Sequence, residues 1–335
     1  MLSKLKNELN NLNLIKQLFL SPNKYSTSIT HYNISIILLL VMSQTGCQKD
    51  LQSNPDLDIK TQPTYIQIAE KQNFRVNLIK SYWSRSSFEI KWYDENKDNH
   101  NEIGEGHLIM IKPDRIALTF TKLGEIYSWA GCNDQLFWLF EGGDNPKVYV
   151  ARNENAFTEK CAELPISVHP LELLDLLCFF DFQLIDTTDD SSNKLFYQIL
   201  PDNNKAMWTL IIPARWSNQK IYFDPETLLP SRIELLSKYN NEILVTADLS
   251  QYIKMEVQGV SLGNLPKVPA WVVINDLRSD TTLRLALRSP SDQTATKGPV
   301  REAMFDFDVI KRKMRPAEYI ILDQESQNPA LDPTK

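Results

Sequence analysis

The spacing of apolar residues changes once along the chain, from a helical period to a period of two. In residues 65–83 apolar side chains recur at close to helical spacing, and Pro63 stands near the start, which predicts one amphipathic helix. After it, Phe88, Ile90 and Trp92 alternate with other residues, as in a strand that buries one face. The pattern therefore predicts a helix followed by β structure.

The alternating pattern continues as six short strands separated by turns. Six of the ten glycines fall in residues 104–143, where tight turns between such strands need residues that tolerate positive φ. We therefore predict an antiparallel meander. Its strands are marked by apolar positions in residues 88–92, 108–110, 116–120, 127–129, 136–140 and 148–150.

A short apolar segment, residues 170–180, interrupts the strands. It begins with Pro170, which suits the first turn of a helix, and it is apolar on nearly every side, so we predict a helix that is covered on most of its surface. No linker separates two cores, so we predict one domain over residues 63–322, followed by a disordered tail over residues 323–335. The later strands are expected at residues 195–199, 208–212, 221–223, 233–235 and 243–247, with weaker ones at 268–274, 283–287 and 303–307.

The N-terminal segment has the order of an export signal. Four lysines and one glutamate precede an uncharged apolar run at residues 34–42, which is too short for the about 20 helical residues of a membrane span. The run leads to Thr45-Gly46-Cys47, which resembles the lipobox of bacterial lipoproteins, whose cysteine is acylated and becomes the new N-terminus. The resemblance implies a signal peptide over residues 1–46, a palmitate-type lipid on Cys47 and a flexible tether over residues 47–62. A chance Gly-Cys pair after an ordinary signal is the alternative.

Composition excludes several classes of protein. The chain has 335 residues, of which 42% are hydrophobic and 23% charged, the balance of a globular protein rather than of a disordered or polytopic membrane protein. Lys and Arg total 36 against 42 Asp and Glu, so no basic excess is available to bind nucleic acid. Without residues 1–46, which carry four Lys and one Glu, the formal charge goes from -6 to -9, so the acidity belongs to the exported domain.

No catalytic or metal-binding motif stands out in the sequence. It lacks His-Glu-x-x-His, Gly-x-Ser-x-Gly, Cys-x-x-Cys and the phosphate-binding Gly-x-x-x-x-Gly-Lys-Ser/Thr loop. Two acidic pairs, Asp189 with Asp190 and Asp306 with Asp308, lie in polar or alternating contexts that favour solvated carboxylates. We therefore predict a protein without metal, cofactor or catalytic residues, and not an enzyme.

Three cysteines remain after the lipid-attachment residue. Cys178 lies in the apolar helix and is predicted to be a buried thiol, whereas Cys132 in a turn and Cys161 before a proline are candidates for a disulfide. The one basic run, residues 311–315, is predicted to be a solvated loop, with contact to anionic headgroups or an acidic partner as the alternative.

Three segments carry a family resemblance. Residues 106–116 contain Gly-x-hydrophobic-x-x-x-Lys-Pro-x-Arg-hydrophobic, residues 138–140 are Trp-Leu-Phe, and residues 222–232 contain Asp-x-x-Thr-x-hydrophobic-Pro. In this order, with the apolar helix at residues 170–180 between them, they resemble the lipoprotein-sorting carriers and receptors of the LolA and LolB type. The resemblance implies a mainly β (α+β) fold, a half-open antiparallel β-barrel of about eleven strands with a helical lid or plug and an apolar cavity for acyl chains.

Alternation marks the residues that would line such a cavity. A lipid tail binds mainly by removing methylene groups from water, about 0.8 kcal/mol for each one buried, so the site needs an apolar lining more than any reactive group. The alternative for each of these residues is ordinary core packing. The candidates are Phe88, Ile90, Trp92, Leu108, Met110, Leu118, Phe120, Trp138, Phe140, Leu174, Leu177, Phe180, Trp208 and Leu210.

The expected function is binding rather than chemistry. We expect a membrane-anchored lipoprotein that faces the periplasm and holds acyl chains of lipoproteins or lipids during transfer or sorting in the cell envelope. Gln48 stands after the cysteine where Asp would retain a lipoprotein, which favours the outer membrane over the inner. Opening of the helix at residues 170–180 would expose the cavity. The alternative is a structural or sensing envelope lipoprotein with a filled cavity, which contacts another protein through its sheet edge or residues 311–315.

Overall fold

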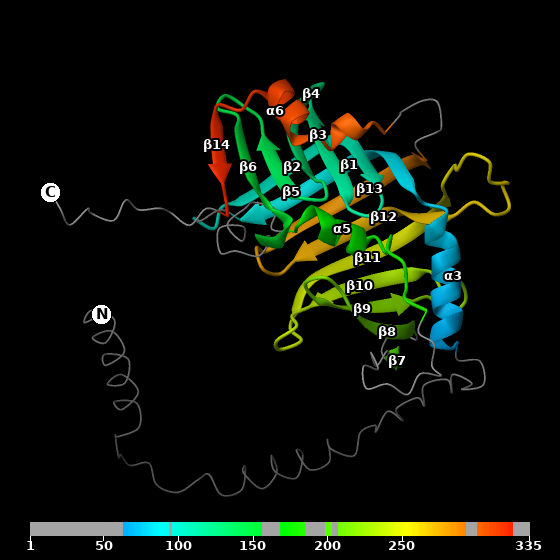
Figure 1. Ribbon diagram of the computed structural model, residues 1–335. Coiled ribbons are helices and arrows are strands. Elements are labelled where there is room, and N and C mark those ends of the chain that lie inside the picture. Colours follow the sequence, from blue (N-terminus) through cyan, green and yellow to red (C-terminus); the bar gives the residue numbers. More distant parts are fainter. Residues whose placement is uncertain are drawn as a thin grey trace, which may run out of the picture. The chain divides into compact units, whose positions relative to one another are not determined.

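Fourteen strands form one open sheet that organises the fold (Figure 1). The computed structural model describes residues 63–93, 96–155, 168–184, 207–292 and 300–323, and the backbone of residues 198–202. Neighbouring strands follow the order β14-β6-β5-β4-β3-β2-β1-β13-β12-β11-β10-β9-β8-β7. All of these pairs are antiparallel except β14 with β6.

Helix α3, Tyr65–Asn77, opens the described part of the chain and is shorter than the sequence pattern predicts. Thr64 and Gln67 form a capping box at its start, in which each side chain accepts the backbone N–H of the other residue. The prediction of a helix through residue 83 is wrong at its end, because the chain leaves the helix at Leu78 and enters strand β1, Ser81–Tyr93. Burial in the first half of β1 alternates with period two, the spacing of a strand.

The predicted six-strand meander is confirmed. Strands β1 to β6 pair as successive antiparallel neighbours. Gly124 and Gly143 take φ angles of 88° and 107° in two of the connecting turns, which explains part of the glycine cluster. The remaining strands of this half are β2 (Asn99–Ile111), β3 (Arg115–Lys122), β4 (Glu125–Cys132), β5 (Leu136–Glu141) and β6 (Lys147–Arg152), with a short 3-10 turn η3 (Asn153–Asn155) after it.

The second half of the sheet is a further meander, which the pairing of β13 with β1 joins to the first. Most of its strands extend beyond the predicted positions, because alternation marks the buried centre of a strand and not its ends. Of the strand predicted at residues 195–199, the first three residues lie outside the described part. The strands are β7 (Gln198–Asp202), β8 (Met207–Pro213), β9 (Asn218–Phe223), β10 (Pro230–Leu236), β11 (Ile243–Lys254), β12 (Lys267–Asp276) and β13 (Thr281–Ser291).

Helix α5, Pro170–Leu176, lies between the two halves of the sheet and contacts β3, β4 and β10 (Figure 1). Its leucines are buried around most of its circumference, as the apolar pattern predicts. The helix ends four residues earlier than predicted, because Cys178 takes a left-handed φ of 55°. We call the sheet face that packs toward α5 the inner face.

The C-terminal segment forms a second layer over the outer face of β2–β6. Its elements differ from those that the sequence pattern predicts. The strand predicted at residues 303–307 is wrong: the chain forms a 3-10 turn, η4 (Glu302–Met304), and helix α6 (Phe307–Met314), whose N-cap Asp306 accepts the N–H of Val309. The predicted loop at residues 311–315 is wrong as well, because its first four residues belong to α6. A fourteenth strand, β14 (Glu318–Ile321), follows and was not expected.

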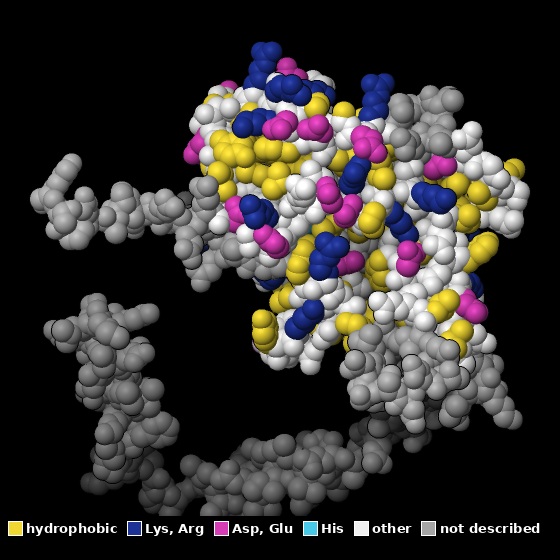
Figure 2. Space-filling model, viewed as in Figure 1, with side chains coloured by type: hydrophobic (Ala, Val, Ile, Leu, Met, Phe, Trp, Pro, Cys, Tyr) yellow, Lys and Arg dark blue, Asp and Glu magenta, His cyan; other side chains and the backbone are white. Residues whose placement is uncertain are grey.

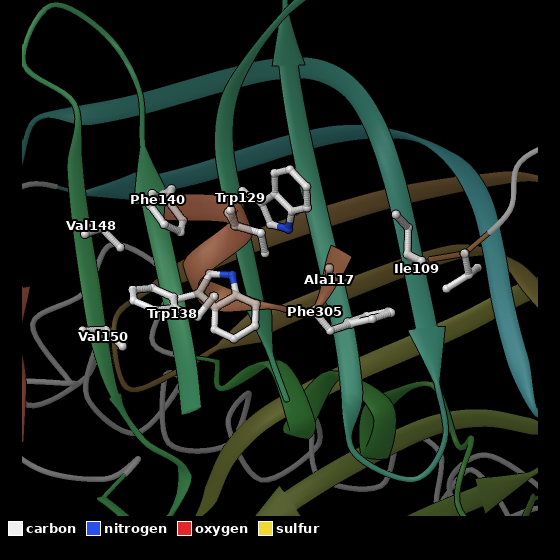
Figure 3. Close-up of a cluster of buried hydrophobic side chains, with 11 residues drawn as sticks. Ile109, Ala117, Trp129, Trp138, Phe140, Val148, Val150 and Phe305 are labelled. Atoms are coloured by element: carbon white, nitrogen blue, oxygen red, sulfur yellow. The ribbon is translucent and has the colours of Figure 1, made fainter. Parts of the chain in front are cut away.

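Aromatic side chains hold this outer layer in place. Trp129, Trp138 and Phe140 project from β4 and β5, and Phe305 and Phe307 cover them from the C-terminal segment (Figure 3). The rings of Trp138 and Phe307 have centroids 5.6 Å apart. The sheet is therefore buried on both faces in this region.

The fold class predicted from the sequence is confirmed. The protein is mainly β, with an open, largely antiparallel sheet and a helix against its inner face. The sheet has fourteen strands where about eleven were expected. None of the helices in the described ranges is long and apolar enough to cross a membrane.

Replacing Gly106 by alanine tests how closely β2 and β3 approach each other. A Cβ atom at this position would lie 1.7 Å from the backbone oxygen of Thr119, so the strands would have to move apart. We expect Gly106→Ala to lower the free energy of unfolding by about 2 kcal/mol or more, measured by urea denaturation. Gly263→Ala is the matched control, because nothing lies within 4 Å of its added Cβ, and it should change stability by less than about 0.5 kcal/mol. Equal stability of the two variants would refute the close approach.

Candidate functional site

An apolar groove opens on the inner face of β1–β5, away from α5. His169 at the start of α5 packs on Phe137 at the start of β5, whereas the groove reaches Glu141 at the end of that strand. Its volume is about 220 Å³, below the roughly 300 Å³ at which typical small-molecule sites begin. The lining residues are Phe88, Ile90, Trp92, Glu102, Leu118, Phe120, Tyr127, Ser128, Ala130, Leu139, Glu141 and Gly142.

Two glycines on β2 allow aromatic rings to form the floor of the groove. Gly104 and Gly106 stand opposite Phe88 and Ser86 on β1, and Gly106 also faces Phe120 on β3. A Cβ atom on Gly104 would lie 2.6 Å from the Phe120 ring. The rings of Phe88 and Phe120 therefore meet over β2, with centroids 5.7 Å apart.

Carboxylates are the charged groups of the groove lining. Glu102 lies 2.9 Å from the ammonium of Lys122, which also approaches the face of the Tyr127 ring. Burial raises the pKa of Glu141, and a hydrogen bond from Tyr149 on β6 opposes that rise. The groove thus combines an apolar floor with hydrogen-bond acceptors at its sides.

The hairpin ends beside the groove expose apolar side chains to solvent. Leu123 at the β3–β4 turn is fully exposed, and Ile103 on β2 is 65% exposed. Tyr93 and Tyr127 are also more than one-third exposed. Clusters of exposed large apolar residues are uncommon on soluble surfaces and accompany contacts with other apolar groups.

Five of the fourteen predicted lining residues line this groove. Leu108, Met110, Leu177 and Leu210 are almost fully buried in the packed core, and Trp208 is buried as well. Leu174 and Phe180 line a separate cleft of about 180 Å³ beside α5. The five that line the groove are Phe88, Ile90, Trp92, Leu118 and Phe120.

Trp138 and Phe140 do not reach the groove, because they lie on the outer face of β5 beneath α6 (Figure 3). In the strand register Leu139 lies opposite Ala130, and Ala130 lies opposite Leu118, so Leu139 shares the inner face with them. Alternation groups the residues of a strand into two faces but does not say which face is inner. The polar lining residues were missed because only the register shows that Glu102 faces Ile90.

Side chains from three elements fix α5 against the sheet. At its start the carboxylate of Glu172 accepts two hydrogen bonds from Arg278, at 3.3 and 3.0 Å, and Arg278 also binds Asp276. At its end Arg75 of α3 donates to the carbonyl oxygen of Cys178 at 2.7 Å. Lys112 forms an ion pair with Asp181, which follows the end of α5, at 3.4 Å, and also donates to the carbonyl of Val76 in α3. Burial lowers the pKa of this lysine. Side-chain contacts therefore hold α5 at both ends.

Two buried titratable groups on α5 have opposite pKa shifts. Burial lowers the pKa of His169 to about 3, and the nearby charges of Arg215 and Arg278 add to the effect. Its Nδ1 accepts the N–H of Leu171, and its Nε2 has no hydrogen-bond partner in the described part of the chain. Burial, with the charge of Glu172 second, raises the pKa of Asp175 to about 7.

Two of the four cysteines lie in the described part of the chain. Cys132 and Cys178 are both buried, and burial raises the pKa of the Cys178 thiol to about 11. Cys161 and Cys47 lie outside the described residues, so the disulfide and the lipid attachment stay predictions. Within the described ranges no three His, Cys, Asp or Glu side chains come together as a metal site.

Comparisons with known proteins find likenesses among solved structures only. No family model matches the chain, and no curated protein matches it. The chain is similar to a LolA superfamily protein from Nitrosomonas europaea, with 13% identity, a TM-score of 0.42 and coverage of 74% of this chain and 99% of that one. The chain is also similar to a putative outer membrane lipoprotein-sorting protein domain from Vibrio parahaemolyticus, with 13% identity and a TM-score of 0.40. The match covers 74% of this chain and 98% of that one. A DUF1329 family protein from Desulfovibrio piger is 12% identical, with a TM-score of 0.36, and the match covers 72% of this chain and 96% of that one. These likenesses concern the chain trace alone.

The pKa of His169 predicts a specific effect of acid on stability. In the unfolded chain this histidine takes up a proton below about pH 6.5, whereas the folded protein resists it down to about pH 3, so His169 destabilises the fold as the pH falls. Asp175 acts in the opposite direction between about pH 7 and 3.8, since the folded state holds its proton. The two effects offset each other in the wild type.

The variant His169→Asn keeps a side-chain cap for α5 and removes the titration. Between pH 7.5 and pH 5 it should gain about 2 kcal/mol of unfolding free energy relative to the wild type, measured by urea denaturation at both pH values. A stability difference that does not change with pH would contradict a buried neutral histidine.

Proposed function

We propose that this protein is a membrane-anchored lipoprotein that holds acyl chains in the inner-face groove of β1–β5 for transfer or sorting in the cell envelope. The observation that carries the proposal is the groove itself, an opening with a predominantly hydrocarbon and aromatic lining. Every methylene group that enters it contributes about 0.8 kcal/mol, so a chain binds without any reactive residue. On this proposal the protein is a carrier or receptor and not an enzyme.

The size of the groove implies that a long chain needs more room than the closed structure offers. The groove holds about 220 Å³, and the interior toward α5 is filled by side chains such as Leu108 and Leu177. Displacement of α5 would lengthen the groove, and burial of the chain would offset the cost of breaking the contacts of Arg75, Lys112 and Arg278. The exposed Leu123 and its neighbours would meet the acyl donor or the membrane surface.

A second candidate function is contact with another envelope protein through α6. The helix carries Lys311, Arg312 and Lys313 on its exposed surface, with Arg315 directly after it. Lys311 lies 4.3 Å from the centroid of the Tyr319 ring and Lys313 lies 5.4 Å from that of Trp129. Figure 2 shows basic and acidic side chains mixed on the face around α6, so this surface favours a partner that carries both charges over a uniformly anionic one.

A larger side chain inside the groove should weaken ligand binding. Ala130 lies on the inner face of β4 and lines the groove, so the larger side chain of Ala130→Leu would occupy space that an acyl chain needs. We expect at least about a tenfold loss of affinity for glycerol monopalmitate, measured by native mass spectrometry of the Cys47→Ser form. The matched control is Ala303→Leu, at an exposed position in η4, which should bind as the parent does.

The two candidate functions predict different outcomes of this experiment. A parent protein that never binds an acyl ligand would remove the carrier proposal and leave contact through α6. Equal affinity of Ala130→Leu and Ala303→Leu would mean that chains bind elsewhere.

The proposed anchor is tested separately. Cys47→Ser removes the thiol that would be acylated, so cells fed labelled palmitate should incorporate label into the wild type and not into the variant. The variant should also move from the membrane fraction to the soluble fraction. Cys178→Ser is the control, because its thiol is buried in the fold, and it should keep the label. Label retained by Cys47→Ser would exclude lipid attachment at this cysteine.

A further inference from the structure

The charged residues that line the groove are both acidic. Its twelve lining residues include two carboxylates, Glu102 and Glu141, and no Lys, Arg or His. An apolar lining attracts any hydrocarbon chain, so the groups beside it decide which head the chain can carry. Each carboxylate can act on a head only with the capacity that its present partners leave.

Glu141 keeps its acceptor capacity for a ligand. It pairs in register with Ser128 on β4 and Lys147 on β6, and Tyr149 hydrogen-bonds to it. Lys147 forms its ion pair with Glu318 of β14, at 3.1 Å, and its charge also favours the ionised form of Glu141. No ion pair joins Glu141 to a cation among the described residues.

Glu102 forms an ion pair with Lys122, a cation beside the rim of the groove. Its carboxylate lies 2.9 Å from the ammonium of Lys122, which is half exposed and lies outside the lining. An anionic head at the rim would have to compete with Glu102 for this lysine. The same head would lie beside Glu141, where partial burial strengthens repulsion between like charges.

We propose that the groove selects amphiphiles by the charge of the head, accepting heads that carry N–H or O–H donors and no negative charge and rejecting carboxylate and phosphate heads. This inference rests on the proposed function, since it names the ligand class of the same groove. Glu141 accepts a hydrogen bond from the head, while the chain lies over Phe88 and Phe120. The carboxylates are specificity determinants and the aromatic floor supplies affinity.

Three ligands that share one chain separate the charge of the head from the contribution of the tail. Dodecanoate, dodecylamine and glycerol monododecanoate are titrated calorimetrically into the Cys47→Ser full chain at neutral pH, below their micelle-forming concentrations. We expect the amine and the glycerol ester to bind at least about tenfold more tightly than dodecanoate. Dodecanoate binding as tightly as the others would overturn the inference and leave the proposed function standing. Failure of all three to bind would overturn both.

A charge-removing variant assigns the selectivity to one residue. Glu141→Gln keeps the size of the side chain, so dodecanoate affinity should rise about tenfold and dodecylamine affinity should fall, while the glycerol ester changes little. Glu105→Gln is the matched control, because it removes one carboxylate from the exposed side chain of a β2 residue that does not line the groove, and it should keep the wild-type order. An unchanged order in Glu141→Gln, or the same change in Glu105→Gln, would refute the role of Glu141.

Discussion

Enclosure of α5 is the constraint on which the rest of the structure depends. A seven-residue helix with leucines on most of its circumference cannot lie on a flat surface, because half of its apolar area would stay in water. The sheet supplies two walls, with β3 and β4 on one side and β10 on the other. A helix this short is not stable alone, so its ends are held by Arg278 and Arg75. The groove lies where the inner face continues beyond the reach of the helix.

The outer layer follows from the same need to cover apolar surface. Strand β5 is buried along four successive residues, which a strand with one solvent face would not show. Trp138 and Phe140 require a cover, and the C-terminal segment supplies it through Phe305, Phe307 and Ile310. This double coverage gives the region around the groove a packed support.

The sequence is sufficient for the class of the fold and for most of its strands, because period two is a local property that each strand carries by itself. The sequence does not show which face of a strand is the inner one, because this depends on the partner strands. Alternation does not distinguish Leu139 and Glu141 from Trp138 and Phe140, because β5 is apolar at both phases and the register alone separates its two faces. Helix α6 lies where a strand at residues 303–307 and a loop at residues 311–315 are expected, although Asp306 is a good N-cap and Ile310 and Met314 continue a helical spacing. The predicted end of α3 is misplaced because Trp83 falls at a helical interval by chance.

Under the proposed function, the affinity and the specificity of the groove have separate physical origins. Burial of a hydrocarbon chain is favourable whatever head follows it, and its size grows with the number of methylene groups, so an apolar lining alone cannot tell one amphiphile from another. The head is distinguished only where it meets fixed charges or hydrogen-bonding groups in a partly dehydrated setting. Glu141 is held in such a setting by Tyr149, and Glu102 by Lys122. The glycines of β2 let the rings of Phe88 and Phe120 approach each other over that strand, and the two carboxylates are the charged groups that line the groove beside this floor.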